Sequence, residues 1–234
     1  MESDTKTNVE SNEPARALFF ELEFLATSGR AFLYDAVKTV LSDHGIKLAP
    51  VIFAQYFAPY SLPSALKRLG RAHAVDALAS VDVLDTIQAA YVRMIKDDDH
   101  RNKGLITLTH DLLKHGIELG AVTCLDRESV ADLLAKLNLD ASAIHVLAAQ
   151  DHGKAFPTAQ DWLTLAKQMN TSTTLCTVAA TSAAACGSAL CAGMRCFAVP
   201  DSLTSFQDFS GADYVIESLD GAAEKLVLKL VEAF

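Results

Sequence analysis

The sequence lacks any surplus of basic residues. Of its 234 residues, 20 are Lys or Arg and 29 are Asp or Glu, so the formal net charge is −9. A chain without a basic face is a poor ligand for the phosphates of nucleic acid, so no nucleic-acid partner is expected. The sequence also lacks an uncharged apolar run of about 18 residues, the length that a membrane helix needs, so no membrane partner is expected either.

Residues 1–14 lack the basic start and the apolar stretch of a signal peptide. This segment is polar and carries acids, and it is predicted to form a flexible tail. We therefore expect the chain to reside in the cytoplasm, where thiols remain reduced.

Cysteine pairs with metal-binding spacing are absent. The chain contains five cysteines, at Cys124, Cys176, Cys186, Cys191 and Cys196, and none of them forms a C-x-x-C pair. The five-residue step from Cys186 to Cys191 does not place two ligands on one helix face. We expect small, reduced core residues, with a metal site or a redox pair as the alternatives.

Hydrophobic residues make up half of the chain, which argues for a packed protein rather than a disordered one. The apolar segment from Ala17 to Leu22 predicts a buried strand, and the pattern from residue 31 to about 103 is helical. Beyond Gly104, predicted strands alternate with predicted helices. The strands are expected near 119–124, 144–148, 175–179, 196–199 and 214–216, and the helices near 105–115, 129–137, 158–169, 182–192 and 221–232.

Alternation of this kind predicts βαβ units and a parallel sheet covered on both faces. The fold class is therefore α/β, with a Rossmann-like, three-layer αβα core and an inserted all-helical cap. We assign residues 15–31 and 104–234 to the core and 32–103 to the cap.

Polar residues follow several of the predicted strands. Glu21 and Glu23 follow the first strand, Thr123 follows the second, Lys154 precedes the helix near 158, and Thr181 follows the strand near 175–179. Open parallel sheets bind ligands at the carboxyl ends of their strands, so we expect these side chains at one edge of the sheet.

Five short motifs in order then carry a family resemblance. They are Phe20-Glu21-Leu22-Glu23, Ala121-Val122-Thr123, Gly153-Lys154-Ala155-Phe156-Pro157, Ala192-Gly193-Met194 with Ala198-Val199-Pro200, and Ala212-Asp213-Tyr214-Val215-Ile216 with Ser218-Leu219. With these motifs the chain resembles the haloacid dehalogenase-type phosphohydrolases, in the phosphoglucomutase- and phosphoglycolate-phosphatase-like branch with a helical cap.

The resemblance implies a phosphoryl-transfer site. In the family, an aspartate at the position of Glu21 attacks phosphorus, and an aspartate at the position of Glu23 is the general acid and base. The hydroxyl at Thr123 and the amine at Lys154 correspond to the groups that hold the phosphoryl oxygens. Acids that help to hold Mg²⁺ correspond to Ala180 and Thr181 here.

The departures fall at the positions that matter most. The extra methylene of Glu21 or Glu23 moves a carboxylate by about 1.5 Å, and a misplacement of about 1 Å can cost on the order of 100-fold in rate. Ala180 and Thr181 supply no carboxylate for Mg²⁺. No cofactor is therefore expected, although the family uses Mg²⁺.

These departures favour a catalytically impaired pseudoenzyme with a binding or regulatory role. Two alternatives stay open. One is an active phosphatase or phosphomutase-type hydrolase of a small phosphorylated metabolite that uses unusual residues. The other is an interaction module that binds a protein partner through the cap surface. As the one cation expected nearby, Lys154 is predicted to pair with Glu21, Glu23 or both.

Overall fold

The computed structural model describes residues 15–148 and 157–232. A six-stranded sheet lies at the centre of the molecule. Its strands are β1 (Ala17–Glu21), β2 (Glu118–Val122), β3 (Ile144–Leu147), β4 (Cys176–Ala180), β5 (Arg195–Ala198) and β6 (Tyr214–Val215). All neighbouring strands are parallel, and their order is β3-β2-β1-β4-β5-β6. The strand β1 lies inside the sheet, between β2 and β4.

The strand β1 has the sequence of a strand that is covered on both faces. All five of its residues are buried, and a continuous apolar run is typical of a parallel strand between two helical layers. Phe19 stacks on Trp162, with ring centroids 6.4 Å apart. Leu18 and Phe20 belong to the hydrophobic cluster on the opposite face. Successive side chains of β1 therefore bind both helical layers to the sheet.

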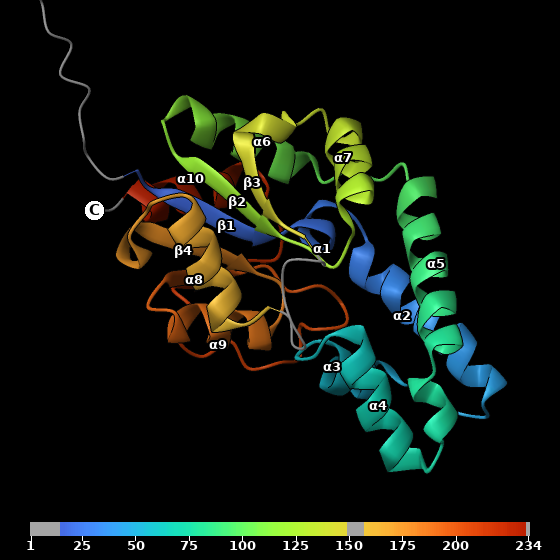
Figure 1. Cartoon of the computed structure of the whole chain (residues 1–234). Helices are drawn as coiled ribbons and strands as arrows, with labels where there is room; N and C mark the ends of the chain where they lie inside the picture. The colour runs from blue at the N-terminus through green and yellow to red at the C-terminus, as the bar shows by residue number, and fades with distance from the viewer. Residues whose placement is uncertain (1–14, 149–156, 233–234) are drawn as a thin grey trace, which may run out of the picture.

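Two layers of helices enclose the sheet (Figure 1). One layer contains α6 (Lys103–Lys114), α7 (Arg127–Lys136) and α10 (Gly221–Glu232), and the other contains α8 (Ala159–Gln168) and α9 (Ala183–Cys191). Short 3-10 turns, η2 (Ala141–Ala143) and η4 (Thr173–Leu175), lead into β3 and β4. The predicted α/β fold class with its three-layer core is confirmed.

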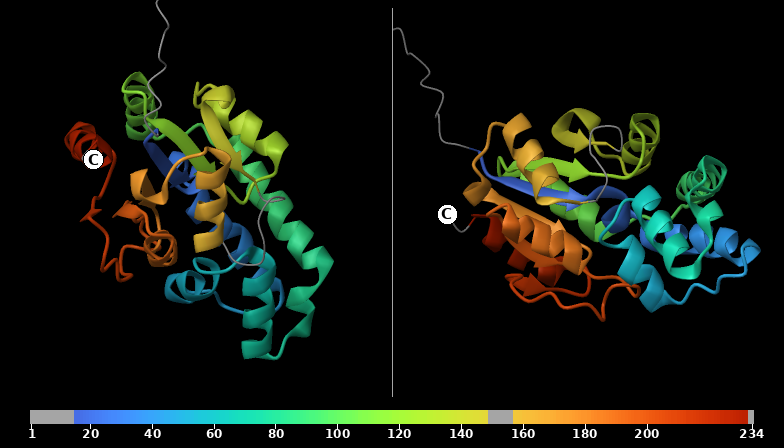
Figure 2. Two further views of the ribbon diagram at one scale, coloured as in Figure 1. Left: turned by 60° about the vertical axis from the view of Figure 1, so that its left-hand side comes forward. Right: turned by 60° about the horizontal axis from the view of Figure 1, so that its bottom comes forward.

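A helical segment separates β1 from the rest of the core. It comprises α2 (Gly29–Asp43), α3 (Pro50–Phe57), α4 (Leu62–His73), η1 (Asp76–Ala79) and α5 (Val81–Asp97). Residues 32–103 are all described and contain no strand, as predicted. Figures 1 and 2 show α2 and α5 side by side, extending beyond the carboxyl ends of the strands. This segment is the cap, and its buried residues share one hydrophobic cluster with the core.

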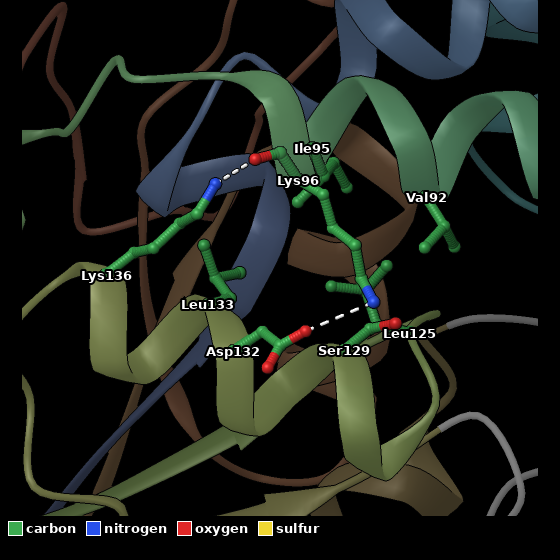
Figure 3. Close-up of a pocket in the computed structure, with 8 residues that line it drawn as sticks. All are labelled: Val92, Ile95, Lys96, Leu125, Ser129, Asp132, Leu133 and Lys136. Carbon is green, nitrogen blue, oxygen red and sulfur yellow. Dashed lines mark hydrogen bonds and ion pairs between the residues drawn. The ribbon is translucent and has the colours of Figure 1, made fainter.

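The helices α5 of the cap and α7 of the core contact each other directly (Figure 3). The Lys96 amine lies 3.1 Å from the Asp132 carboxylate, and the Lys136 amine donates to the backbone oxygen of Lys96. Beneath these exposed polar groups, Ile95 and Leu133 are each 3 % exposed. The apolar pair is the stronger part of the contact, because exposed ion pairs contribute little.

One local expectation needs correction. The strand predicted to run through Leu22 ends at Glu21, and a short helix, α1 (Leu22–Ala26), follows at once. Leu22, Leu25 and Ala26 are buried in it, but five residues are too few for a helical period to stand out from an apolar strand.

The cysteines also differ in part from the expectation. All five are free thiols, but Cys191 is exposed and Cys124 is only partly buried. The helix α9 that carries Cys191 consists almost entirely of small residues, so its outer face has no polar signature in the sequence.

Within the described parts of the chain, no helix has both the length and the apolarity needed to cross a membrane.

Candidate active site

Glu21 lies at the carboxyl end of β1 and is 1 % exposed. Its Oε2 atom accepts two hydrogen bonds from Thr181, one from the backbone N at 2.7 Å and one from Oγ1 at 2.6 Å. Thr181 directly follows β4, and the parallel pairing of β1 with β4 brings the two strand ends together. A position that would supply a metal ligand in the family therefore supplies two hydrogen-bond donors here.

A buried arginine completes the surroundings of Glu21. The Arg30 guanidinium donates from Nη2 to Thr181 Oγ1 at 2.5 Å and from Nε to Asp201 Oδ2 at 2.8 Å. Its Nη2 atom also lies 3.8 Å from Glu21 Oε1, and its central carbon lies 4.2 Å from the centre of the Phe24 ring. Arg30 is 3 % exposed. These four contacts hold it between the strand ends.

Asp201 is positioned for Arg30 by the loop that follows β5. The Leu203 backbone N donates to Asp201 Oδ1 at 2.8 Å. Thr204, which is fully buried, donates from Oγ1 to the backbone oxygen of Thr181 at 2.8 Å. The loop is therefore fastened to the end of β4, and its carboxylate faces Arg30.

Glu23 lies in α1 and is fully buried. Its Oε2 accepts from Thr123 Oγ1 at 2.6 Å, and its Oε1 accepts from the Cys124 backbone N at 2.8 Å. The predicted phosphate-binding hydroxyl of Thr123 therefore contacts the glutamate at the acid–base position. Thr123 Oγ1 in turn accepts from the Leu125 backbone N at 3.1 Å.

Burial governs the electrostatics of both glutamates. Desolvation raises the pKa of Glu21 above its ordinary 4.5, against the lowering effect of Arg30 and of the hydrogen bonds from Thr181. Desolvation likewise raises the pKa of Glu23. The largest contributions that lower this pKa are the hydrogen bonds from Thr123 and Cys124. Both carboxylates are costly in their charged forms.

Two further groups belong to this site and were not identified from the sequence as parts of it. Tyr91 of α5 is 4 % exposed, and its hydroxyl has no hydrogen-bond partner in the described regions. Desolvation and then the charge of Glu23 raise the pKa of Tyr91 well above 10.0. The same two causes, in the same order, raise the pKa of the Cys124 thiol well above 9.0. The cap therefore places a buried phenol close to the strand ends.

The structure thus brings together Glu21, Glu23, Thr123 and Thr181, as the sequence predicted. Lys154 lies outside the described residues, so its pairing with the glutamates stays a prediction. The expectation that Lys154 would be the one cation nearby is wrong, because Arg30 lies there. One signal could have identified Arg30: it is a cation in the first turn of a helix, where the helix dipole disfavours positive charge.

The residues of this site do not fit Mg²⁺. This ion prefers several oxygen ligands in near-octahedral geometry, but Ala180 and Thr181 carry no carboxylate. Glu21 Oε2 already accepts two hydrogen bonds, and Oε1 faces the Arg30 guanidinium. Across the described residues, no group of three or more His, Cys, Asp or Glu side chains could hold a metal ion.

Solved structures with the same fold include hydrolases and phosphomutases. The beta-phosphoglucomutase of Clostridium difficile matches with a TM-score of 0.77 at 16% identity, over 94% of this chain and 98% of that chain. CbbY of Rhodobacter sphaeroides in complex with phosphate matches with a TM-score of 0.73 at 17% identity, over 88% and 95%. A HAD family hydrolase of Deinococcus radiodurans with bound phosphate and sodium matches with a TM-score of 0.62 at 19% identity, over 93% and 96%.

No family model matches the sequence, and no curated protein sequence matches it. The similar solved structures and the parallel sheet nevertheless show the fold. It is that of the haloacid dehalogenase-type hydrolases with a helical cap, as the resemblance implied.

Proposed function

We propose that this protein binds a small phosphorylated metabolite at the carboxyl edge of its sheet and does not hydrolyse it through a phosphorylated carboxylate. The observation that carries this proposal is the state of Glu21, the residue at the nucleophile position. Its carboxylate is buried, accepts two hydrogen bonds from Thr181 and faces Arg30.

A carboxylate that attacks phosphorus must present an oxygen to the reacting atom at about 3–3.5 Å. Glu21 Oε2 is engaged by Thr181, so an attack by this oxygen would break both hydrogen bonds, and the other oxygen, Oε1, faces the Arg30 guanidinium at 3.8 Å. Charge-assisted hydrogen bonds of this kind contribute roughly 1.5–3 kcal/mol each. This cost would add to the barrier of the chemical step.

The developing charge of phosphoryl transfer also lacks its usual partner, since the residues present do not fit Mg²⁺. Without that cation, the negative charge on the equatorial oxygens would meet Glu21 and Glu23 in a buried site. Both glutamates have pKa values raised by desolvation, so their charged forms are already costly in this site. These properties oppose turnover.

A ligand-binding role has separate support from the cap. The buried Tyr91 hydroxyl has no partner in the described part of the chain, and an unsatisfied buried hydroxyl costs roughly 1–3 kcal/mol. A polar group of a bound ligand would satisfy it. CbbY of Rhodobacter sphaeroides has been solved with xylulose-1,5-bisphosphate, which makes sugar phosphates the first ligand class to test.

The test combines a turnover assay with a binding assay on the full chain. We expect no phosphate release from a panel of sugar phosphates above a no-protein control, with or without MgCl₂. We also expect no covalent phosphoryl group in the intact mass after treatment with acetyl phosphate. At least one sugar phosphate should raise the thermal midpoint, and the Tyr91→Phe variant should lose part of that shift.

The matched variant for the turnover arm is Glu21→Gln, which removes the charge at nearly constant shape. Phosphate release that disappears in Glu21→Gln would contradict the proposal, because it would show that Glu21 turns over substrate. Absence of binding across the whole panel would contradict the ligand class.

A further inference from the structure

We infer that the Arg30 guanidinium takes the place that a divalent cation holds in this fold, so that the site carries its own permanent cation. The inference starts from position 181. Through the family resemblance this position corresponds to a metal-holding acid, and here Thr181 Oγ1 accepts a hydrogen bond from Arg30 Nη2 at 2.5 Å.

The other contacts of Arg30 are also those of a central cation. Its Nη2 atom lies 3.8 Å from Oε1 of Glu21, the residue at the nucleophile position, and its Nε donates to Asp201 Oδ2 at 2.8 Å. Groups from three separate parts of the chain, at the ends of β1, β4 and β5, thus converge on one positive charge. A planar guanidinium suits this task because its donors diverge in a fixed fork.

Arg30 is not free to leave this position. The side chain is 3 % exposed, and its guanidinium lies over the face of Phe24 at 4.2 Å, a cation–π contact that strengthens with burial. The Phe24 ring therefore forms one apolar wall of the arginine site.

The position of Arg30 in its own helix also supports its role as the cation of the site. Arg30 is the second residue of α2, and the dipole of a helix disfavours a cation in the first turn. Its position is therefore explained by Glu21, Asp201 and Phe24 and not by the helix.

Charge balance gives the consequence. The guanidinium of Arg30 reduces the formal charge of the set it forms with Glu21 and Asp201 from −2 to −1, which weakens the attraction for a second cation. Mg²⁺ also gives up its water reluctantly, and within a few ångströms of Arg30 it would meet a like charge. The site is therefore closed to Mg²⁺ by the presence of Arg30 as well as by the lack of an acid at position 181.

Two variants separate these two causes. In Thr181→Asp the acid is restored, but the new carboxylate should pair with Arg30. In the double variant Arg30→Met, Thr181→Asp the acid is restored and the guanidinium is gone. Calorimetric titration with MgCl₂ should show no binding to the wild type or to Thr181→Asp. The double variant should bind Mg²⁺ at least about tenfold more tightly than Thr181→Asp, because it offers the same carboxylates without the guanidinium that pairs with them.

Thr181→Asp alone binding Mg²⁺ as tightly as the double variant would overturn the inference. A second measurement needs no variant. The thermal midpoint of the wild-type chain should be the same in millimolar MgCl₂, in NaCl of equal ionic strength and in EDTA, and a rise specific to Mg²⁺ would also overturn the inference. The inference does not depend on the proposed function, since turnover without metal would leave every one of these outcomes unchanged.

Discussion

At the scale of single residues, the two buried glutamates are balanced in different ways. Glu21 faces the positive charge of Arg30. Glu23 accepts from the neutral hydroxyl of Thr123 and from the backbone N of Cys124. A buried carboxylate held by neutral donors keeps more of its desolvation cost. Glu23 is therefore the residue whose ionisation should be visible in the stability of the protein.

The first prediction concerns the pH dependence of that stability. Burial raises the pKa of Glu23 above its unfolded value of 4.5. The stability that the protonated Glu23 carboxyl contributes is therefore fully present below about pH 4.5, and it is lost as pH rises through the folded-state pKa. We expect the free energy of unfolding of the wild type, minus that of Glu23→Gln, to fall between pH 4.5 and neutral pH. Urea unfolding of both proteins at several pH values measures this difference, and a constant difference would contradict the prediction.

The second prediction concerns the thiol of Cys124. Desolvation and the charge of Glu23 raise its pKa well above 9.0, and the thiolate is the form that reacts with iodoacetamide. Cys124 should be alkylated slowly at mildly alkaline pH, and Glu23→Gln should accelerate it by roughly threefold or more, since one pKa unit is tenfold in thiolate. Peptide mass spectrometry measures the rate.

The exposed thiol of Cys191 in the same samples is the internal reference for that experiment. Its rate should not differ between the wild type and Glu23→Gln. An unchanged ratio of the Cys124 rate to the Cys191 rate would show that Glu23 does not act on Cys124.

At the scale of elements, the third prediction concerns the close packing of α6 against the segment around Leu219. A Cβ added at Gly104, in the first turn of α6, would lie 1.6 Å from the backbone oxygen of Leu219. A Cβ added at Gly187, within α9, would meet nothing within 4 Å. Two glycines in helices therefore occupy opposite environments.

We expect Gly187→Ala to stabilise the protein by about 0.5–1 kcal/mol, the usual gain in a helix. Gly104→Ala should destabilise it despite the same gain, because the Leu219 backbone must move. Chemical denaturation of the two variants provides a matched comparison. Equal stabilisation in both would show that α6 and the segment around Leu219 are not in close contact.

At the scale of the whole molecule, cap and core share one hydrophobic cluster. Buried residues of the cap, such as Ile87, and of the sheet, such as Leu119, belong to the same contiguous set. We therefore expect one cooperative unfolding transition. The fluorescence of Trp162, the single tryptophan, reports on the core, and circular dichroism reports on all helices. The two transitions should coincide.

Two variants at the contact between α5 and α7 test the expectation of a single transition. Ile95→Ala removes buried apolar volume and should cost roughly 2–5 kcal/mol in both signals together. Asp132→Ala removes an exposed ion pair with Lys96 and should cost less than about 1 kcal/mol. Loss of helical signal ahead of the Trp162 transition in Ile95→Ala would show that the cap unfolds independently.

The sequence alone determined the succession of strands and helices along the chain. It also determined the convergence of Glu21, Glu23, Thr123 and Thr181. The physical reason is that hydrophobic periodicity places the strands, and the carboxyl ends of parallel strands share one edge. The helical character of residues 32–103 was equally local. Each of these features depends on neighbours in the chain or on a single rule of sheet geometry.

The partners of these side chains were decided only by the tertiary structure. Arg30 and Asp201 are 171 residues apart, and their pairing depends on where the loop after β5 returns to the end of β4. Tyr91 reaches the site only because α5 of the cap packs against α2 and against α7 of the core. The sequence does not show which residues Arg30 and Tyr91 contact, because long-range contacts leave no periodic signal near either residue.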